Sequence, residues 1–417
     1  MSRRVEVTVG RGSRRAAGLM ALAVVTLVAG GVAAATTPGS PGAAHPTARH
    51  AAPAPADGAV ASGDPSSVPP GTVLPPAGPG APTQVPSGGP VLADVGHAAP
   101  KAAPARTLPP PLPEPNRASA PGGAAPDRGS GAVWPGDFPD PFVLPSAPMY
   151  YAYSTQVGLT DVPTIRSTDL VHWQWVGDAL PRLPSWASWG YLWAPSVLSR
   201  GATYVLYYTT RDSATDRQCL SRAVSAVPQG PFVDSSSGPL VCQTDRGGSI
   251  DPSPFVDRDG TPYLQWQSEG TLNGEPPRVW SQQLTADGLN LVGQPRELIH
   301  QDQGWEFPIV EAPSMFRDGN RYYLFYSGNR WQTAAYAIGY AVCASAVGPC
   351  TKPSSSPLLA SSGSLAGPGG ESVFTDATGA TRLAYHAWTQ PDVGYPKGAR
   401  RLHISSLSFV GGQPVVR

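Results

Sequence analysis

Five short motifs recur along the chain, and three of them carry a carboxylate. The acidic motifs are Pro-Asp-Pro-Phe with Asp140, Ile-Asp-Pro-Ser-Pro-Phe with Asp251 and Val-Glu-Ala-Pro-Ser-Met with Glu311, while the uncharged motifs hold Ala194 and Gly370 at the matching place. Glycosidic bond hydrolysis needs two carboxyl groups that flank the scissile bond, one to donate a proton and one to accept a proton. Three acids that meet at one axis would supply that chemistry.

Each of these acids also has a structural interpretation. An Asp that precedes Pro at the start of a strand is commonly a turn or capping residue. Asp137 competes with Asp140 as the proton acceptor, but Asp137 lies outside the Pro-Asp-Pro core. Glu306 lies five residues before Glu311, and the sequence leaves its role open.

The regular spacing of the motifs predicts the elements that position them. Successive motifs are separated by 54, 57, 60 and 59 residues, and each runs into a turn and an aromatic or aliphatic strand. The turns are expected at Pro145–Pro148, Asp259-Gly260 and Asp318–Asn320, and at single glycines in the other units. A unit of about 57 residues accommodates four strands of ordinary length. We therefore predict an all-β fold, a five-bladed β-propeller, because a β-sandwich or jelly roll would not explain the near-constant step.

The first 130 residues differ in composition from the rest. Residues 1–35 combine a basic start, an apolar stretch and a small-residue site at Ala33-Ala34-Ala35, which is typical of a secretory signal peptide; the alternative is an N-terminal membrane anchor. Residues 36–130 are rich in Pro, Ala and Gly, so we expect a disordered linker. Every Trp and Tyr lies in residues 131–417, the predicted catalytic domain.

Charge and cysteine usage narrow the class of protein. The chain has 29 basic and 29 acidic side chains and no basic stripe, so we expect no nucleic-acid partner. No protein partner is evident, and we expect a monomer. Four cysteines behind a secretory signal indicate disulfides, which we pair as neighbours, Cys219–Cys242 and Cys343–Cys350. Zinc is the alternative, but the chain lacks a C-x-x-C pair.

Residues 134–417 resemble glycoside hydrolase family 43, whose members are five-bladed propeller enzymes that act on arabinose- and xylose-containing polysaccharides. Any one of the motifs is weakly specific, but all of them occur in the family's order. The matching motifs are Phe138–Pro141, Trp193-Ala194-Pro195, Ser249–Phe255, Glu311-Ala312-Pro313 with Tyr323–Ser327, and Gly367-Pro368-Gly369 with Tyr385-His386.

The resemblance implies a role for each acid. Asp140 corresponds to the general base that activates water, and Glu311 to the general acid that protonates the leaving oxygen. Asp251 corresponds to a third carboxylate that raises the pKa of the acid and orients it. A neighbouring anion favours the protonated form of a carboxyl group, in agreement with that last role. Water as the nucleophile implies inversion at the anomeric carbon.

The resemblance also implies residues that bind the sugar. Trp193 corresponds to an aromatic wall of the sugar subsite; a core tryptophan is the alternative, and Trp186 or Trp189 could take that place instead. Phe138 of the first motif is a further candidate for substrate contact.

Two candidates come from the last repeat. His386 is expected to contact the substrate, with a buried structural histidine as the alternative. The doublet Arg400-Arg401 is expected to supply one arginine to the sugar hydroxyls, and Arg401 is taken for that role although the doublet leaves the choice open.

Residue 370 departs from the family pattern. Many members have a His after Gly-Pro-Gly that helps to hold a central metal ion, and this chain has Gly370 there. We therefore expect no required cofactor or metal. A central calcium or sodium ion would have to be held by water or by His386.

The sequence thus indicates a secreted inverting glycoside hydrolase that cleaves pentose bonds in plant polysaccharides, as an α-L-arabinofuranosidase or arabinanase on an arabinose- or xylose-containing oligo- or polysaccharide. The alternatives are a β-D-xylosidase and a non-catalytic carbohydrate-binding propeller. The three acids favour an enzyme, because a binding module needs no proton donor. The loops around Trp186–Trp193 and Trp305–Phe307 are expected to close one end of the cleft, which favours exo action.

Overall fold

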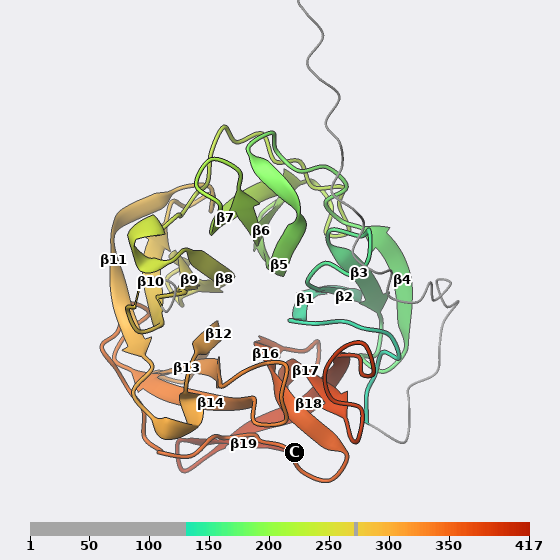
Figure 1. Ribbon diagram of the computed structural model, residues 1–417, viewed down its shortest axis with the longest axis vertical. Helices are drawn as coiled ribbons and strands as arrows, with labels where there is room; N and C mark the ends of the chain where they lie inside the picture. Colours follow the sequence, from blue (N-terminus) through green and yellow to red (C-terminus); the bar gives the residue numbers. More distant parts are fainter. Residues whose placement is uncertain (1–130, 271–273) are drawn as a thin grey trace, which may run out of the picture. The chain divides into compact units, whose positions relative to one another are not determined.

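Five antiparallel sheets surround a central axis and form a ring (Figure 1). This computed structural model describes residues 131–270 and 274–417. The signal peptide expected at 1–35 and the linker expected at 36–130 lie outside the described residues. The predicted all-β fold, a five-bladed β-propeller, is confirmed, and each sheet is one blade.

The chain completes each blade before it starts the next. Blade 1 contains β1 (Phe142–Ser146), β2 (Met149–Tyr153), β3 (Pro163–Ser167) and β4 (Trp173–Asp178), and blade 2 contains β5 (Ala187–Arg200), β6 (Thr203–Asp212) and β7 (Arg217–Ser225). Blade 3 contains β8 (Ser249–Val256), β9 (Pro262–Ser268), β10 (Arg278–Leu284) and β11 (Leu291–His300). Blade 4 contains β12 (Val310–Asp318), β13 (Arg321–Gly328), β14 (Ala337–Cys343) and β15 (Cys350–Thr351). Blade 5 contains β16 (Leu365–Thr375), β17 (Thr381–Thr389), β18 (Arg401–Val410) and β19 (Gln413–Val416).

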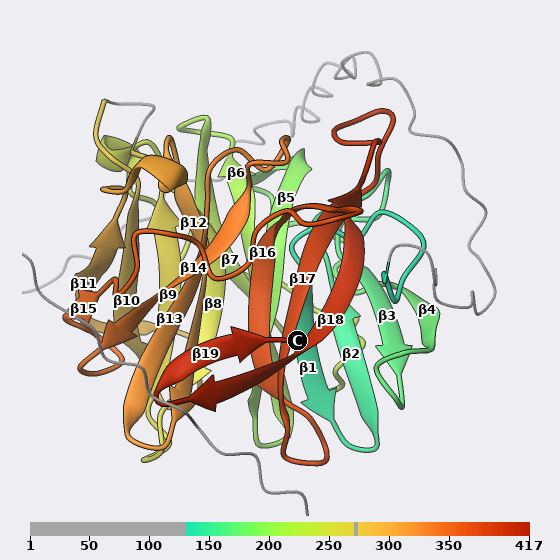
Figure 2. The same cartoon turned by 90° about the horizontal axis from the view of Figure 1, so that it is seen from below.

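The first strand of each blade lies closest to the axis. β1, β5, β8, β12 and β16 contact one another in turn, and β16 returns to β1. Figure 2 shows from the side that these strands run along the axis. The helical elements are short 3-10 turns such as η1 (Thr244–Arg246) and η3 (Gly304–Glu306). Within 131–270 and 274–417, none of the helices has the length and apolar character needed to cross a membrane.

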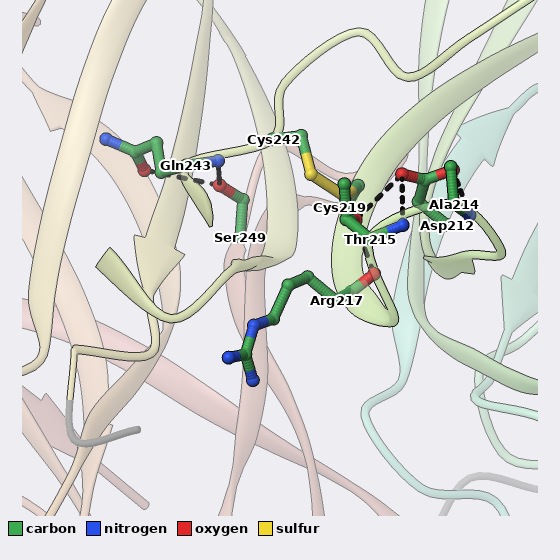
Figure 3. The surroundings of a disulfide bond; sticks show 8 residues. All are labelled: Asp212, Ala214, Thr215, Arg217, Cys219, Cys242, Gln243 and Ser249. Carbon is green, nitrogen blue, oxygen red and sulfur yellow. Dashed lines mark hydrogen bonds between the residues drawn. A yellow bond between two sulfur atoms is a disulfide. The ribbon is translucent and has the colours of Figure 1, made fainter. Parts of the chain in front are cut away.

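Blade 2 departs from the expected four-stranded unit, because its sheet has three strands. The segment after β7 pairs with β7 only through isolated bridges, Leu220 with Val241 and Val224 with Val233. The disulfide Cys219–Cys242, drawn in Figure 3, joins the sequence neighbours of the first of these bridges. A covalent link there restricts the segment that replaces the missing outer strand.

The second disulfide, Cys343–Cys350, joins two residues that lie opposite each other on β14 and β15. Each disulfide lies within a single blade, the first in blade 2 and the second in blade 4. The predicted pairing of neighbouring cysteines is confirmed.

The hairpins between first and second strands follow the turn signals in the sequence. β8 and β9 flank Asp259-Gly260, and β12 and β13 are joined through Gly319-Asn320. The turn expected at Pro145–Pro148 is shorter, because Pro145 lies within β1 opposite Tyr150, which leaves Ala147-Pro148 as the turn. Pro145 can occupy that strand because β1 is the edge of its sheet.

The hydrophobic core is divided into five clusters, one at each interface between neighbouring blades. Tyr207 and Tyr208 of β6 illustrate the arrangement: Tyr208 packs toward blade 1 and Tyr207 toward blade 3. Successive side chains of a strand point to opposite faces. Both faces of a blade are covered, so its second strand is buried on both faces instead of alternating between buried and exposed residues.

The ring is closed by the segment that precedes β1. The backbone N–H of Val133 donates to the carbonyl of Leu402 at 2.8 Å, and that of Phe138 donates to the carbonyl of Arg400 at 2.7 Å. Trp134 and Phe138 are buried in the cluster between blades 5 and 1. Residues from both ends of the described chain therefore build this last interface.

Candidate active site

Five equivalent backbone positions mark the inner wall of the ring. In β5, β8, β12 and β16 the register shifts by one residue, and a residue in each bulge has a positive φ. A bulge inserts one extra residue and bends the strand locally. Blade 1 has the same feature just before β1. The five left-handed residues line the central channel: Asp140 (φ 51°), Ala194 (42°), Asp251 (57°), Ala312 (53°) and Gly370 (60°).

The position expected for Glu311 in this ring was wrong by one residue. Glu311 pairs with Ser327 in blade 4 as Ile250 pairs with Gln267 in blade 3, so Ala312 is the equivalent of Asp251. When the five motifs are aligned on their acids, this offset is hidden. When they are aligned on the residue before proline, Ala312 and not Glu311 matches Asp251. Only two of the five ring positions, Asp140 and Asp251, carry a carboxylate. Glu311 is the residue before the ring position of blade 4, Ala312.

Hydrogen bonds between blades hold the bulges. A backbone N–H of the ring donates to a side chain of the preceding blade in each case: Asp140 to His386 Nδ1 (3.0 Å), Ala194 to Thr155 Oγ1 (2.8 Å), Asp251 to Thr209 Oγ1 (3.0 Å), Ala312 to Asp251 Oδ2 (2.9 Å) and Gly370 to Ser327 Oγ (3.0 Å). Non-glycine residues in left-handed conformations persist only where the surroundings fix them. These bonds supply that restraint.

Asp140 is held in its ionised form. The hydroxyl of Thr155 donates to Asp140 Oδ2 at 2.6 Å, and Arg400 Nη1 lies 3.5 Å from Asp140 Oδ1. Burial alone would raise the pKa of Asp140. The guanidinium of Arg400 is the largest of the effects that outweigh burial, the bond from Thr155 adds to it, and the pKa of Asp140 lies well below its usual range.

Glu311 is held in its protonated form up to neutral pH. The side chain is buried, and Oε1 accepts a hydrogen bond from the hydroxyl of Tyr336 at 2.7 Å. Burial, together with the negative charge of Asp140, raises the pKa of Glu311 to about 7, against the opposing effect of the Tyr336 bond.

Asp251 interacts with both of these acids. Burial and the charges of Glu311 and Asp140 raise the pKa of Asp251 well above its usual value. The two groups are coupled, so ionisation of either one disfavours ionisation of the other. Of the three acids at and beside the channel, Asp140 is thus ionised and the coupled pair Asp251 and Glu311 retains a proton, which is the separation that acid–base catalysis requires.

The structure places two of the expected substrate contacts in the interior instead. Phe138 is 1% exposed and packs edge-on against Trp134 in the cluster between blades 5 and 1. His386 is 0% exposed, and its Nδ1 is occupied by the backbone N–H of Asp140. Neither ring reaches solvent, so both expectations of substrate contact are corrected.

Trp193 lies next to the ring position of blade 2. It is half-buried and precedes Ala194, so it occupies in blade 2 the position that Glu311 occupies in blade 4. The exposed aromatic residues Trp189 and Tyr191 lie just before it on β5. Phe307 and Tyr395 are exposed on loops of blades 4 and 5.

The arginine beside the acids is Arg400, and the choice of Arg401 is corrected. Consecutive side chains at the start of β18 point to opposite faces, and it is Arg400 that lies 3.5 Å from Asp140. The guanidinium of Arg400 also lies over the ring of Trp331, 4.3 Å from its centroid.

The two competing acids have structural partners. Asp137 accepts hydrogen bonds from the hydroxyl of Tyr395 at 2.6 Å and from the backbone N–H of Arg400 at 2.7 Å. Glu306 is fully buried, where it pairs with Lys352 Nζ at 2.8 Å and accepts a bond from the hydroxyl of Tyr326 at 2.7 Å.

Sequence reasoning missed Glu371, Tyr336 and Thr155. Glu371 lines the channel at the position that is proline in the other four motifs, and this substitution is the signal that could have identified it. Its carboxylate accepts a bond from Ser327 at 2.5 Å, and burial raises its pKa to about 8. Tyr336 and Thr155 lie in loops after second strands, and nothing in their sequence context distinguishes them.

The residues present do not fit a metal held through position 370. An ideal Cβ on Gly370 would lie 2.5 Å from Asp140 Oδ1 and 2.6 Å from His386 Nδ1, so these side chains fill the space. The lone pair of His386 Nδ1 is already used. Among the described residues, no group of three or more His, Cys, Asp or Glu side chains could hold a metal ion.

Comparisons with known proteins show which family this chain is similar to. Residues 131–414 match the family model described as glycosyl hydrolases family 43. The arabinan endo-1,5-alpha-L-arabinosidase C of Emericella nidulans is 27% identical to this chain over 313 residues, which cover 69% of this chain and 93% of that protein.

Solved structures share the fold. A thermostable family-43 glycoside hydrolase is 31% identical with a TM-score of 0.61, and the match covers 67% of this chain and 93% of that one. A protein from Bacteroides thetaiotaomicron described as an endo-1,4-beta-xylanase is 28% identical with a TM-score of 0.58, and the match covers 69% of this chain and 96% of that one.

Proposed function

This chain belongs to glycosyl hydrolases family 43, and from that membership and the chemistry of its channel we propose that it hydrolyses internal α-1,5 bonds between L-arabinofuranosyl units of arabinan. It is a glycoside hydrolase of the inverting type. The substrate is supported by the relative from Emericella nidulans, whose whole length is nearly covered by the match.

Asp140 acts as the general base in this proposal. Its carboxylate is kept ionised by Arg400 and Thr155, so it can take a proton from a water molecule that attacks the anomeric carbon. A water molecule fits between the sugar and the base only when base and acid are separated by about 6.5–9.5 Å, which is the arrangement of inverting enzymes.

Glu311 acts as the general acid. A pKa of about 7 keeps its proton available to the departing sugar oxygen. Asp251 supports this role in two ways, because its charge disfavours ionisation of Glu311 and its Oδ2 fixes the backbone of Ala312, the residue next to the acid.

The observation that carries the proposal is that the pKa values of three interacting carboxyl groups are shifted in opposite directions. A cation lowers the pKa of Asp140, while burial and like charge raise those of Glu311 and Asp251. A non-catalytic sugar-binding propeller has no use for a buried, protonated carboxyl group beside an ionised one.

Activity on linear α-1,5-arabinan tests the proposal. Internal cleavage is expected to release a mixture of oligosaccharides early in the reaction. This differs from the exo action that the loops led us to expect. Release of a single short product would instead support exo action. We expect Asp140→Asn and Glu311→Gln each to lower kcat by about 10²–10⁴-fold. Asp259→Asn is the matched control, because Asp259 lies in the hairpin between β8 and β9.

Two outcomes would overturn parts of the proposal. Turnover of xylan without turnover of arabinan would reassign the substrate, in line with the xylanase among the similar structures. Turnover that survives Asp140→Asn or Glu311→Gln in a folded protein would remove that residue from its role.

The remaining assignments belong to the same proposal. Two disulfides support passage through an oxidising compartment, as expected of an exported enzyme that acts on a polysaccharide. We propose that residues 131–417 suffice for catalysis, that the enzyme acts as a monomer and that none of its steps depends on a cofactor.

A further inference from the structure

Two stacked rings connect the proposed acid with the proposed base. Tyr336, from the loop between β13 and β14, lies against His386 of β17 with ring centroids 5.8 Å apart and planes inclined by 12°. Both side chains are buried, at 1% and 0% exposure. The pair lies between blades 4 and 5, and its two members bond to Glu311 in blade 4 and to the backbone of Asp140 just before blade 1.

Tyr336 selects one oxygen of Glu311. Its hydroxyl donates to Glu311 Oε1 at 2.7 Å. Burial and the charges of Glu311 and Asp140 raise the pKa of Tyr336 well above its usual value, so the phenol remains a donor. Because Oε1 already accepts this hydrogen, the transferable proton of Glu311 resides on Oε2.

His386 is restricted to one tautomer. A backbone N–H can only donate, so the bond from Asp140 at 3.0 Å requires an unprotonated Nδ1 and leaves the ring proton on Nε2. Burial lowers the pKa of His386 and keeps the ring neutral. The 3.3 Å approach of Nδ1 to Asp140 Oδ1 is then a contact between two acceptors and not an ion pair.

Two adjacent glycines provide the space for this pair. A Cβ on Gly369 would lie 2.0 Å from Tyr336 Cε1, and a Cβ on Gly370 would lie 2.6 Å from His386 Nδ1. Gly370 also has a φ of 60°, which side chains disfavour. Gly369-Gly370 is therefore a slot that admits the two rings.

We propose that Tyr336 and His386 are positioning residues that act as one stacked unit in the Gly369-Gly370 slot. Tyr336 orients the proton-bearing oxygen of Glu311, and His386 fixes the backbone from which Asp140 projects. The inference rests on the proposed function for the roles of Glu311 and Asp140, and it adds two buried residues that act through them.

Tyr336→Phe tests the first half of the unit, because it keeps the ring and removes the hydroxyl. We expect kcat on linear α-1,5-arabinan to fall by about 10- to 100-fold, as for loss of a hydrogen bond to an ionisable group. The alkaline limb of the pH profile is expected to move to higher pH, because the lost bond favoured the ionised form of Glu311. The other titratable or charged groups that interact with Glu311 are Asp140, Asp251, Glu269, Glu371 and Arg400, and they are unchanged in this variant.

Blade 5 offers a matched control. Tyr385 stacks on His403 with centroids 5.3 Å apart and an angle of 13°, and its hydroxyl pairs with Ser405 and not with a carboxylate. Tyr385→Phe is expected to leave kcat and the alkaline limb unchanged. Equal effects of the two substitutions would assign them to packing and overturn the proposal.

The His386 half is tested by rescue and by spectroscopy. Asn presents a carbonyl oxygen near the position of Nδ1, so His386→Asn is expected to retain about 10-fold more activity than His386→Leu, which offers no acceptor. In protein labelled with ¹⁵N-histidine, the signals lost in His386→Asn are expected to show Nε2 protonated and Nδ1 bare at neutral pH. A proton on Nδ1 overturns the proposal.

These tests separate this inference from the proposed function. One outcome is that Asp140→Asn and Glu311→Gln are inactive while Tyr336→Phe behaves as wild type. That result would end the positioning role and leave the catalytic assignment standing. Full activity of Asp140→Asn or Glu311→Gln would end the catalytic assignment, and the tautomer measurement would still decide the geometry of the pair.

Discussion

Arg400 determines which acid of the channel is ionised. It is 7% exposed, and its guanidinium lies 3.5 Å from Asp140 and over the ring of Trp331. A buried cation that close stabilises the carboxylate form of Asp140 far more than it would in water. The base is therefore prepared by a residue from the end of the chain that lies more than two hundred positions away in the sequence.

Replacement of Arg400 by Met keeps most of the apolar stem and removes the cation. Without the cation the carboxylate of Asp140 is less stable, so its pKa rises, and we expect the acid limb of kcat/KM to move up by about 1–3 pH units. Arg401→Met is the control, because its side chain points to the other face of β18. An acid limb that stays in place in Arg400→Met would show that the cation does not set the ionisation of the base.

Asp251→Asn tests the coupling of the other two acids. The amide keeps an oxygen for the N–H of Ala312 but carries no charge. Loss of a neighbouring anion lets Glu311 release its proton more easily, so we expect the alkaline limb to move to lower pH, away from the value near 7, with a lower kcat. A pH profile identical to that of the wild type would exclude electrostatic tuning by Asp251.

The sequence located the acids but not their geometry. Asp140, Asp251 and Glu311 stand out because each opens a repeat, yet the one-residue offset of Glu311 depends on a bulge whose only sequence mark is the proline after Ala312. Phe138 and His386 lie in motifs that include both core and site residues. Spacing alone does not tell a ring that faces the sugar from one that faces the interior.

At the scale of elements, the loop between β11 and β12 is anchored by a buried ion pair. Glu306 in η3 is fully buried, and Lys352, from the segment after β15, reaches it at 2.8 Å with its side chain 7% exposed. Trp305 of the same loop stacks on Tyr326 with centroids 5.9 Å apart. Phe307, the residue after Glu306, is exposed on this anchored loop.

Lys352→Met is expected to destabilise the fold by about 3–5 kcal/mol, because it leaves the carboxylate of Glu306 buried without its cation. Asp302→Asn removes the other, 51% exposed partner of the same lysine, and its expected cost is about 0–1 kcal/mol. Free energies of unfolding from urea titration measure both. Equal costs for the two variants would mean that Glu306 is not the anchor.

Among the elements, hairpins were predictable and the outer strands were not. An Asp-Gly turn constrains the backbone locally, so the junction of β8 and β9 could be identified from Asp259-Gly260. The outer strand of blade 2 has no such determinant. Two isolated bridges and the Cys219–Cys242 disulfide take its place, and these depend on contacts distant in sequence.

At the scale of the whole molecule, stability depends on closure of the ring. Blade 5 meets blade 1 through a cluster that includes Trp134 and Phe138, and through backbone bonds from Val133 and Phe138 to the segment that starts β18. Each of the other interfaces joins blades that are neighbours in the sequence. This interface joins the two ends of the described chain, so loss of either end opens it.

Two shortened chains test that dependence. A chain that begins at Gly131 is expected to keep the unfolding temperature and activity of the full chain. A chain that begins at Pro139 loses two buried aromatic residues, each worth about 3–5 kcal/mol, and is expected to unfold at a much lower temperature. Equal stability of the two chains would show that the segment 131–138 does not close the ring.

The central claim is that Glu311 protonates the departing sugar oxygen, and the leaving-group dependence of Glu311→Gln tests it most directly. The measurement is kcat/KM for α-1,5-arabinotriose, which needs protonation, and for an activated aryl arabinobioside, whose leaving group needs none. We predict a loss of about 10²–10⁴-fold on arabinotriose and near wild-type rates on the activated substrate. An equal loss on both substrates would contradict the account.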